Sequence, residues 1–317
     1  MQSQVLKEGY FHMFLLIVSQ LFKMLVILLV GIFCSRIGLV SAEGSRCISN
    51  LLLNIVNPCL ILTVYQTEYD ADLVSGLLVS FAAALLSHII AILISTVLIH
   101  RGSSQDFGLE RYASVYSNCG FIGIPLIGSV LGDTGVFYLT AYMTVFNLLT
   151  WTHGLSQMKG NFRFRNLRDG ILSPMVVSTV LAMILFFVQF RIPGPLLDAM
   201  NYIADMNTPL AMMVAGFAVA GSNLRKICTN LSIYRVAALK LLVIPLAVLL
   251  VLSFLPLDPT VAYTTLIATA CPTATTITMM SILFNKNSAY ASEIFSFTTV
   301  LSILTIPVVI SAAELLL

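Results

Sequence analysis

The segment SNCGFIGIPL, residues 117–126, decides how the rest of the chain is interpreted. It places Asn118, Cys119, Gly120 and Pro125 inside a run that is otherwise apolar enough to span a membrane. Glycine and proline interrupt the helical hydrogen-bond ladder. Backbone N–H and C=O groups that lose their helical partners are tolerated at membrane depth only where protein or a water-filled cavity surrounds them. The segment therefore predicts a broken transmembrane helix beside a cavity.

A second segment of the same kind, IATACPTATTITMM, follows later in the chain. Cys119 and Gly120 have counterparts 152 residues later in Cys271 and Pro272. If the two broken helices cross at these points, their half-helix N-termini present free N–H groups and partial positive charge to a shared cavity. Such a cavity favours a carboxylate, and the amide and hydroxyl groups around it would fix the orientation of the ligand.

The composition is that of a polytopic membrane protein. Hydrophobic residues make up 58% of the 317 residues and charged residues only 9%, against about 25% charged in a soluble domain. The net charge of +2 is too small to indicate a nucleic-acid partner. The six cysteines are scattered singly without a C-x-x-C pair, so neither a metal site nor a disulfide framework is indicated.

Ten apolar segments are long enough to cross a bilayer. An even number of crossings puts both ends of the chain on the same side. Alternate connections contain twelve Lys and Arg residues on one side and two on the other, so the positive-inside rule places both termini outside a plasma or inner membrane. The expected spans are roughly 12–34, 47–66, 72–99, 112–131, 134–156, 169–190, 195–221, 233–255, 259–283 and 288–312.

The two halves of the chain look like a duplication. The basic connection 157–168 separates five spans in 1–156 from five in 169–317, and an odd number of crossings inverts the second copy. Asn57-Pro58 lies 151 residues before Thr208-Pro209, and His88 lies 152 residues before Lys240. The pattern predicts two inverted five-helix repeats.

Ionisable residues at membrane depth are candidates for function because a charge there is costly. Lys240 either extends toward the headgroups or is an internal cation near an anionic substrate or a carboxylate. His88 is either a neutral structural residue or a protonatable coupling group. Asp205 and Glu293 could each bind a proton or sodium, or pair with an internal cation such as Lys240.

Neutral polar residues gather at both interruptions. Hydrogen bonding between membrane helices explains single hydroxyl groups and amides, but it does not explain why such residues concentrate at both breaks. The residues expected to contact the substrate are Asn118, Cys119, Gly120, Pro125, Asn147, Cys271, Pro272, Thr273 and Thr275.

Several motifs together resemble the auxin efflux carrier family. SNCGFIGIPL followed by GDTG, NLLTWTHG from Asn147, Ser173-Pro174, NTPLAMMVAG, and CPTATTITMM followed by FSFTTVLSILTIP carry the resemblance over essentially the whole chain. The short connection at 157–168 is similar to the bacterial malate and malonate permease branch, whereas long plant PIN proteins have a much larger loop there. The second interruption departs from the family pattern because it is rich in hydroxyl groups and lacks an asparagine.

The resemblance implies an all-α fold of ten helices that is shared with bile acid sodium symporters. Helices 1, 2, 6 and 7 would form a scaffold, and helices 3–5 and 8–10 a transport domain that moves as an elevator. Helices 4 and 9 would cross at their breaks, and an anion would bind beside the crossing. Residues near Asn57 and Asn207 would line the opposite, scaffold wall.

The expected function is secondary active transport of a small organic anion, such as an auxin-like or a malate- or malonate-like carboxylate. A sodium-coupled symporter of bulkier, bile-acid-like anions is the alternative. An intramembrane enzyme is disfavoured because the chain has no H-E-x-x-H and no G-x-S-x-G motif. The expected partners are the anion and the lipid bilayer, with a homodimer left open. No cofactor is expected beyond Na⁺ or H⁺ as coupling ion, and uniport is also left open.

Overall fold

The computed structural model describes residues 2–100, 106–159, 171–222, 227 and 229–317. Within these ranges the chain is helical and contains no β-sheet, only an isolated bridge between Ser117 and Thr273. Helices satisfy their own backbone hydrogen bonds, which a hydrocarbon solvent demands. The all-α prediction is therefore confirmed for the described residues. The basic connection 157–168 lies mostly outside them.

The first half of the chain forms five helical regions, two of which contain π-helical turns. The α2, η1 and α3 elements form one continuous run, and so do η2, α6, η3 and α7. Their bounds are α1 (Gln2–Arg36), α2 (Ala42–Leu51), η1 (Leu52–Val56), α3 (Asn57–Val64), α4 (Ala71–Leu98), α5 (Phe107–Val115), η2 (Cys119–Gly123), α6 (Ile124–Leu149), η3 (Thr150–Gly154) and α7 (Leu155–Lys159).

The second half contains one π-helical turn, between α13 and α14. Its longest helix, α17, holds Pro307 in its interior. The bounds are α9 (Pro174–Val188), α10 (Gly194–Ala204), α11 (Asn207–Ala220), α13 (Leu231–Ala238), η4 (Leu239–Val243), α14 (Ile244–Leu252), α15 (Pro259–Ala270), α16 (Thr276–Leu283) and α17 (Ser288–Leu316).

Seven helical regions of the described chain are long and apolar enough to cross a membrane. The expected ten differ from these for local reasons. The expected spans 112–131 and 134–156 share one region, Cys119–Met158, with a non-helical residue at Gly132 (φ 65°) inside it. The expected ninth span, 259–283, is divided into α15 and α16. The expected sixth span, 169–190, contains the 15-residue α9. The protein is thus a multi-pass membrane protein, and the division into ten spans remains an expectation.

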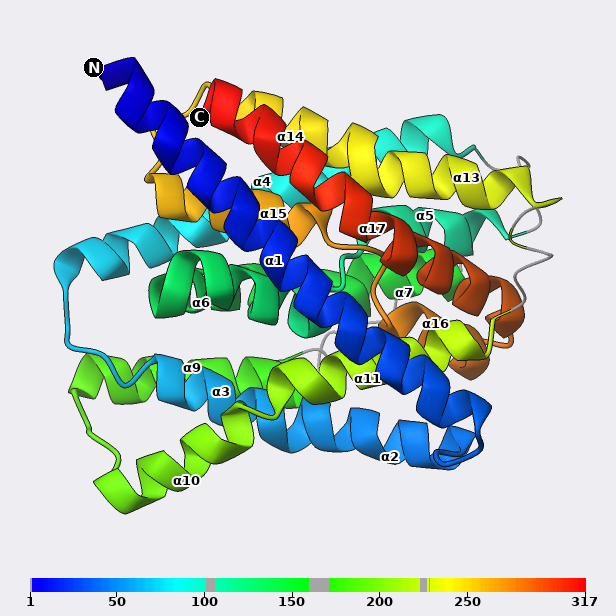
Figure 1. Ribbon diagram of the computed structural model, residues 1–317, viewed down its shortest axis with the longest axis horizontal. Coiled ribbons are helices and arrows are strands. Elements are labelled where there is room, and N and C mark those ends of the chain that lie inside the picture. Colours follow the sequence, from blue (N-terminus) through cyan, green and yellow to red (C-terminus); the bar gives the residue numbers. More distant parts are fainter. Residues whose placement is uncertain (1, 101–105, 160–170, 223–226, 228) are drawn as a thin grey trace.

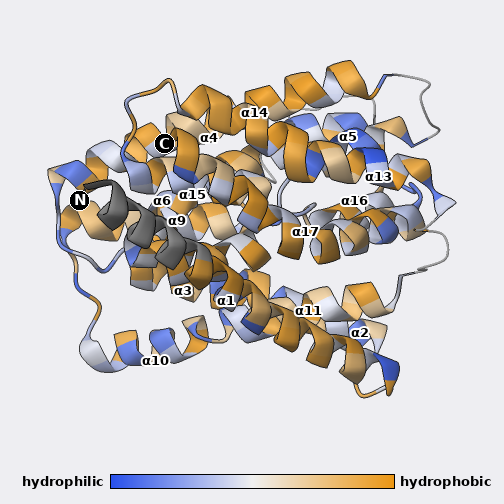
Figure 2. Cartoon of the chain, turned by 45° about the horizontal axis from the view of Figure 1, so that its top comes forward, coloured by the Kyte–Doolittle hydropathy of each residue, from blue (hydrophilic) through white to orange (hydrophobic). Residues whose placement is uncertain are grey.

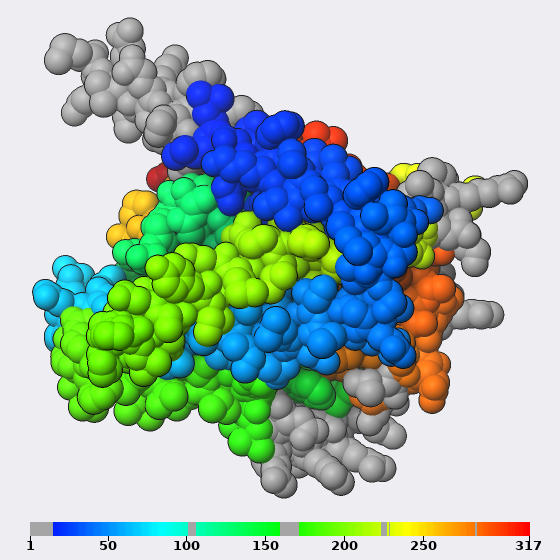
Figure 3. Space-filling model, turned by 60° about the horizontal axis from the view of Figure 1, so that its bottom comes forward, coloured from blue at the N-terminus to red at the C-terminus, as the bar shows by residue number. Residues whose placement is uncertain are grey.

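The helices lie side by side with both ends of the chain at the same end of the bundle (Figure 1). One group contains α2, α3, α9, α10 and α11, and another contains α4, α5 and α13 to α17, with α1 crossing diagonally in front (Figure 1). Elements from both halves of the chain share one face, where α1, α2 and α9 to α11 lie adjacent to one another (Figure 3).

Close packing of α1 against α11 depends on two glycines. A Cβ atom at Gly216 would lie 2.2 Å from the carbonyl oxygen of Leu28, and one at Gly31 would lie 2.5 Å from that of Met213. Small residues allow membrane helices to approach closely where lipid supplies no hydrophobic driving force. These glycines therefore fix α1 against α11.

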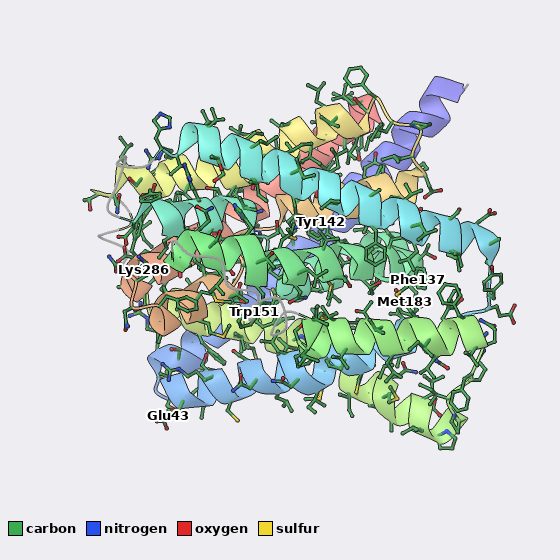
Figure 4. The ribbon with its side chains drawn as sticks, turned by 180° about the vertical axis from the view of Figure 1, so that it is seen from behind. Glu43, Phe137, Tyr142, Trp151, Met183 and Lys286 are labelled. Carbon is green, nitrogen blue, oxygen red and sulfur yellow. The ribbon has the colours of Figure 1, made fainter. Side chains whose placement is uncertain are left out.

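Aromatic side chains join α6 to α3 and α9. The Tyr65 ring, directly after α3, lies 4.4 Å from that of Phe137 in α6, and its hydroxyl is 2.6 Å from Thr140 Oγ1. The Phe137 ring also lies 5.5 Å from that of Phe186 in α9. In Figure 4, Phe137 and Met183 lie close together between α6 and α9.

The outer surface matches a hydrocarbon environment. Large exposed apolar side chains occur along α1, α4, α9 and α14, such as Phe22, Leu93 and Val180. Figure 2 shows hydrophobic residues along most helices and hydrophilic residues gathered at α5, α13 and the helix ends. Glu43 and Lys286 both lie at one of these ends (Figure 4).

Candidate functional site

The first interruption is a short extended segment between α5 and η2. Tyr116 leaves the helical conformation with φ −90° and ψ 122°, and Asn118 has φ −78° and ψ 53°. Helical geometry resumes at Cys119. Pro125 lies beyond the break, at the junction of η2 and α6, where the run that begins at Cys119 is already helical. The break therefore lies at residues 116–118, and the expected role of Pro125 at the site stays a prediction.

The second interruption follows α15 directly. Cys271 is extended, with φ −56° and ψ 148°, and Pro272 has no N–H to continue the ladder. A residue before proline is disfavoured in the helical region, so the Cys271-Pro272 pair ends α15. Helical geometry returns at Thr276, after Thr275.

The two interruptions face each other and pair through their backbones. Ser117 and Thr273 form an antiparallel bridge. On either side of it, the Asn118 amide donates to the Pro272 carbonyl oxygen at 2.7 Å, and the Ala274 amide donates to the Tyr116 carbonyl oxygen at 2.9 Å. The exchange satisfies backbone groups that the broken helices leave open, as a low-dielectric interior requires.

Side chains strengthen this crossing. Thr273 Oγ1 donates to the Ala113 carbonyl oxygen at 2.9 Å, and the Thr273 amide donates to Thr298 Oγ1 at 3.3 Å. The Tyr112 hydroxyl lies 2.8 Å from Thr276 Oγ1. Thr273 is thus a structural member of the crossing.

Backbone donors remain at the two helix starts. The first amides of η2, at Cys119 and Gly120, have no helical acceptor, because the ladder begins with Ile122 and Gly123 donating to the Asn118 carbonyl oxygen. The ladder of α16 likewise begins with the amide of Ile277. Both starts therefore carry partial positive charge beside the crossing.

Two asparagines of the expected scaffold form a buried pair. Asn207 Nδ2 donates to Asn57 Oδ1 at 2.7 Å. Asn57 Nδ2 and Asn207 Oδ1 are buried and have no hydrogen-bond partner within the described residues. Asn57 Nδ2 also lies 3.9 Å from where a Cβ of Gly120 would be, so the pair faces the first interruption.

Asn118 supplies a third unpaired amide atom. Its side chain is 4% exposed, and its Nδ2 has no partner in the described part of the chain. Burying an amide without a hydrogen bond costs about 1–3 kcal/mol. Three such atoms, two donors and one acceptor, therefore lie at or beside one crossing, in a site that a polar ligand can satisfy.

Lys240 is fully buried, with 0% of its side chain exposed. Its Nζ donates to Ser117 Oγ at 2.5 Å and to the Thr269 carbonyl oxygen at 3.1 Å. The alternative that Lys240 extends to the headgroups is therefore wrong. The internal-cation alternative holds, with hydroxyl and carbonyl oxygens as the partners in the described residues.

His88 of α4 packs against Tyr116 at the first interruption and Tyr142 of α6. Its Nδ1 is 2.7 Å from the Ala84 carbonyl oxygen, and its ring centroid is 4.8 Å from that of Tyr142. Figure 4 shows Tyr142 on α6, on the side toward α4. His88 Nε2 is buried without a partner in the described residues.

Three further candidates make no hydrogen bond to residues of the crossing within the described part of the chain. Asp205 ends α10 and is exposed. Asn147 donates its Nδ2 to the Met143 carbonyl oxygen of its own helix at 2.8 Å. Glu293 lines a different cleft, and neither Asp205 nor Glu293 is within ion-pair distance of Lys240.

That other cleft contains a buried charge that sequence reasoning missed. Glu110 is fully buried, forms an ion pair with Arg235 of α13, and accepts from the Tyr290 hydroxyl at 3.0 Å. The cleft measures about 410 Å³ and is lined by Asp106, Glu110, Thr229, Asn230, Ser232, Asn287, Ala289, Tyr290 and Glu293. The sequence indicates a buried charge at Glu110 only weakly, because this residue precedes the expected fourth span by two residues.

The crossing therefore gathers groups that favour negative charge. Helix starts and amide N–H groups favour negative charge, and the Lys240 ammonium adds a full positive charge nearby. The described residues contain no group of His, Cys, Asp and Glu side chains arranged to hold a metal ion. What the geometry defines is a membrane protein with an anion-compatible site between interrupted helices.

Residues 16–310 match the family described as Membrane transport protein, and the chain belongs to this family. The resemblance to auxin efflux carriers is thereby confirmed. The protein is a transporter, not an enzyme.

Individual relatives are similar over much of their length. An uncharacterized transporter of Methanothermobacter thermautotrophicus is 25% identical over 90% of this chain and 94% of its own. A Rhizobium meliloti protein named "Putative malonate transporter" is 26% identical over 66% of this chain and 68% of its own. An uncharacterized transporter of Methanocaldococcus jannaschii is 26% identical over 63% of this chain and 68% of its own.

Proposed function

We propose that this protein is a secondary active transporter of a small organic anion, a mono- or dicarboxylate, which binds at the crossing of the two interrupted helices. The family membership supports transport. The name of the Rhizobium meliloti relative supports a dicarboxylate of malonate size as the first substrate to test.

The observation that carries the proposal is the set of unpaired amide atoms beside the crossing. Asn57 Nδ2 and Asn118 Nδ2 are donors, and Asn207 Oδ1 is an acceptor. A carboxylate accepts hydrogen bonds from the two donors. A hydroxyl or a protonated second carboxyl group on the same substrate would satisfy the acceptor.

The two groups of helices support an elevator mechanism. In the proposed ten-span architecture of inverted repeats, α1 to α3 and α9 to α11 form the scaffold, and the remaining helices form the transport domain. The crossing is built within the transport domain, whereas Asn57 and Asn207 belong to the scaffold. Movement of one group past the other would expose the site to each side in turn, as in other inverted-repeat transporters. Both termini would lie outside.

A small cavity lies next to the first interruption. It measures about 20 Å³ and lies between α1, η2, α11 and α17, with Met24, Ile122 and Met212 in its wall. It has room for about one water molecule.

The coupling ion is either sodium or a proton in this proposal. Sodium would use the backbone carbonyl and hydroxyl oxygens at the crossing. A proton would use a titratable residue such as His88, which is buried at the crossing. Asp205 and Glu293 are less suited to this role because they lie away from the site.

Uptake by proteoliposomes tests the function. Purified protein is reconstituted and given labelled malonate, malate or indole acetate under imposed sodium, proton or potential gradients. We expect uptake of at least one carboxylate and at least a tenfold loss with Asn118→Ala. The exposed Asn201→Ala variant serves as the matched control and should transport normally. Absence of carboxylate transport under every gradient would refute the proposal.

A further inference from the structure

Lys240 differs from every other described cation in its surroundings. Its side chain is fully buried, and no carboxylate of the described residues lies within 4.0 Å of its Nζ. Arg235, by comparison, has its charge balanced by Glu110. A buried charge is expensive unless it is paired or well hydrogen-bonded, so the partners of this ammonium define what the pocket is built to hold.

Those partners are oxygen atoms at the helix crossing. Ser117 Oγ belongs to the first interruption, and the Thr269 carbonyl oxygen belongs to the last turn of α15. Ser117 Oγ and the Thr269 carbonyl oxygen lie 3.3 Å apart, and the Tyr142 hydroxyl lies 3.4 Å from Thr269 Oγ1. Hydroxyl and carbonyl oxygens are also the ligands that hard monovalent and divalent cations prefer.

The electrostatics of α15 also favour a cation beside these oxygen atoms. The C-terminal end of a helix carries partial negative charge and stabilises a cation. Lys240 Nζ lies at that end of α15, whereas the starts of η2 and α16 carry partial positive charge on the other side of the same crossing. Interrupted transporter helices commonly bind a coupling cation at such half-helix C-termini.

We propose that the Lys240 ammonium is a built-in cation that occupies the oxygen-lined position at the crossing where a coupling cation would otherwise bind. This inference rests on the proposed function and deepens it, because it concerns the same crossing. Lys240 ties η4 to both interruptions and supplies the fixed positive charge that a carboxylate balances. Transport by this protein then needs no sodium.

Other groups near Lys240 do not replace it. The titratable residues around it are Cys119 and Cys271, one from each interruption, His88 from α4, and Tyr142 from α6, whose hydroxyl lies beside Thr269. These are two thiols, an imidazole and a phenol, so none is a carboxylate. The positive charge of the pocket therefore depends on Lys240.

The first experiment measures thermal unfolding of purified protein in detergent, which requires no transport. Lys240→Ala shortens the side chain and leaves the oxygen atoms without a cation, whereas Lys240→Met fills most of the space with an apolar side chain. We expect sodium chloride and ethylammonium chloride to raise the Tm of Lys240→Ala by several degrees relative to choline chloride. Wild type and Lys240→Met should not respond.

The second experiment measures carboxylate uptake in sodium and in choline media. Wild-type protein should take up carboxylate equally well in both media. Lys240→Met should remain folded, and its rate of carboxylate uptake should be at least tenfold lower. A wild-type requirement for sodium, or a Lys240→Ala variant whose Tm ignores both cations, would overturn the inference. If no carboxylate is transported at all, the proposed function fails, and the unfolding experiment still decides the role of Lys240.

Discussion

The backbone amide of Asn118 donates a 2.7 Å hydrogen bond to the carbonyl oxygen of Pro272, and so joins two helices whose breaks are more than 150 residues apart in sequence. The bond lies next to the Ser117–Thr273 bridge. Because each interruption completes the backbone hydrogen bonding of the other, the two broken helices should move as one unit during transport.

The Asn57–Asn207 pair should be required for substrate affinity. Asn57→Ala removes an unpaired donor and also leaves Asn207 Nδ2 without its acceptor. We expect about 1–3 kcal/mol of destabilisation and at least a tenfold weaker apparent affinity. The affinity is measured as the carboxylate concentration that stabilises the protein against heat.

Asn54→Ala is the matched control for this variant. Asn54 lies in the same helical run, but it is exposed and donates only to the Asn50 carbonyl oxygen of that run. Its loss should leave substrate stabilisation unchanged. Equal effects of Asn54→Ala and Asn57→Ala would mean that the pair has no direct part in binding.

Gly216→Ala should weaken the contact between α1 and α11. The added Cβ would lie 2.2 Å from the Leu28 carbonyl oxygen, which cannot move without shifting α1. Overpacking of this kind costs about 1–3 kcal/mol, so the Tm should fall. Gly194→Ala is the control, since a Cβ there meets nothing within 4 Å. A Gly216→Ala protein as stable as Gly194→Ala would contradict this account.

The ion pair between the buried Glu110 and the partly exposed Arg235 should stabilise the end of the bundle where α5, α13 and α17 meet. Arg235→Ala leaves the Glu110 carboxylate buried without its cation, which costs about 2–5 kcal/mol. Tyr290→Phe removes only one hydrogen bond and should cost about 1 kcal/mol. Thermal unfolding of Arg235→Ala, Tyr290→Phe and the variant with both changes measures the stability that the ion pair and the hydrogen bond each contribute.

A double-mutant cycle separates the ion pair from side-chain packing. Glu110→Gln combined with Arg235→Ala should be less harmful than the sum of the two single changes, because the second substitution no longer leaves a lone charge. Strict additivity of the single effects would show that the pair contributes no coupling.

The interruptions could be predicted from sequence because their causes are local. Glycine, proline and clustered polar residues disrupt a membrane helix wherever they occur, and Cys271-Pro272 ends α15 as expected. The sequence predicts the position of the first break less accurately, because the backbone departs from helical geometry at Tyr116 and not at Pro125. Proline is also tolerated within a continuous membrane helix, as Pro125 is between η2 and α6 and Pro307 is inside α17, so its presence alone does not locate a break.

Long-range partners could not be predicted from the same patterns. Lys240 contacts Ser117, 123 residues away, and sequence spacing does not distinguish this from an extension to the headgroups. Glu110 was overlooked because its neutralising partner, Arg235, is 125 residues away. The side-chain N–H of Asn147 binds the Met143 carbonyl oxygen of its own helix, and its expected contact with the substrate stays a prediction.

The orientation of the protein in the membrane can be tested at Cys47. The excess of Lys and Arg in alternate connections predicts that the start of α2 faces the cytoplasm. Cys47 is exposed there, whereas Cys119 and Cys271 are buried at the crossing. In a variant that keeps only Cys47, a membrane-impermeant maleimide should label inside-out vesicles and not intact cells.

The opposite side is tested by Glu68→Cys in the cysteine-free background. Glu68 is exposed in the connection between α3 and α4, which the same rule places outside. It should therefore react in intact cells and be protected in inside-out vesicles. Because the two positions lie on either side of one helical run, opposite labelling of both fixes the direction of that run. Labelling of Cys47 in intact cells would reverse the orientation, and with it the assignment of both termini to the outside.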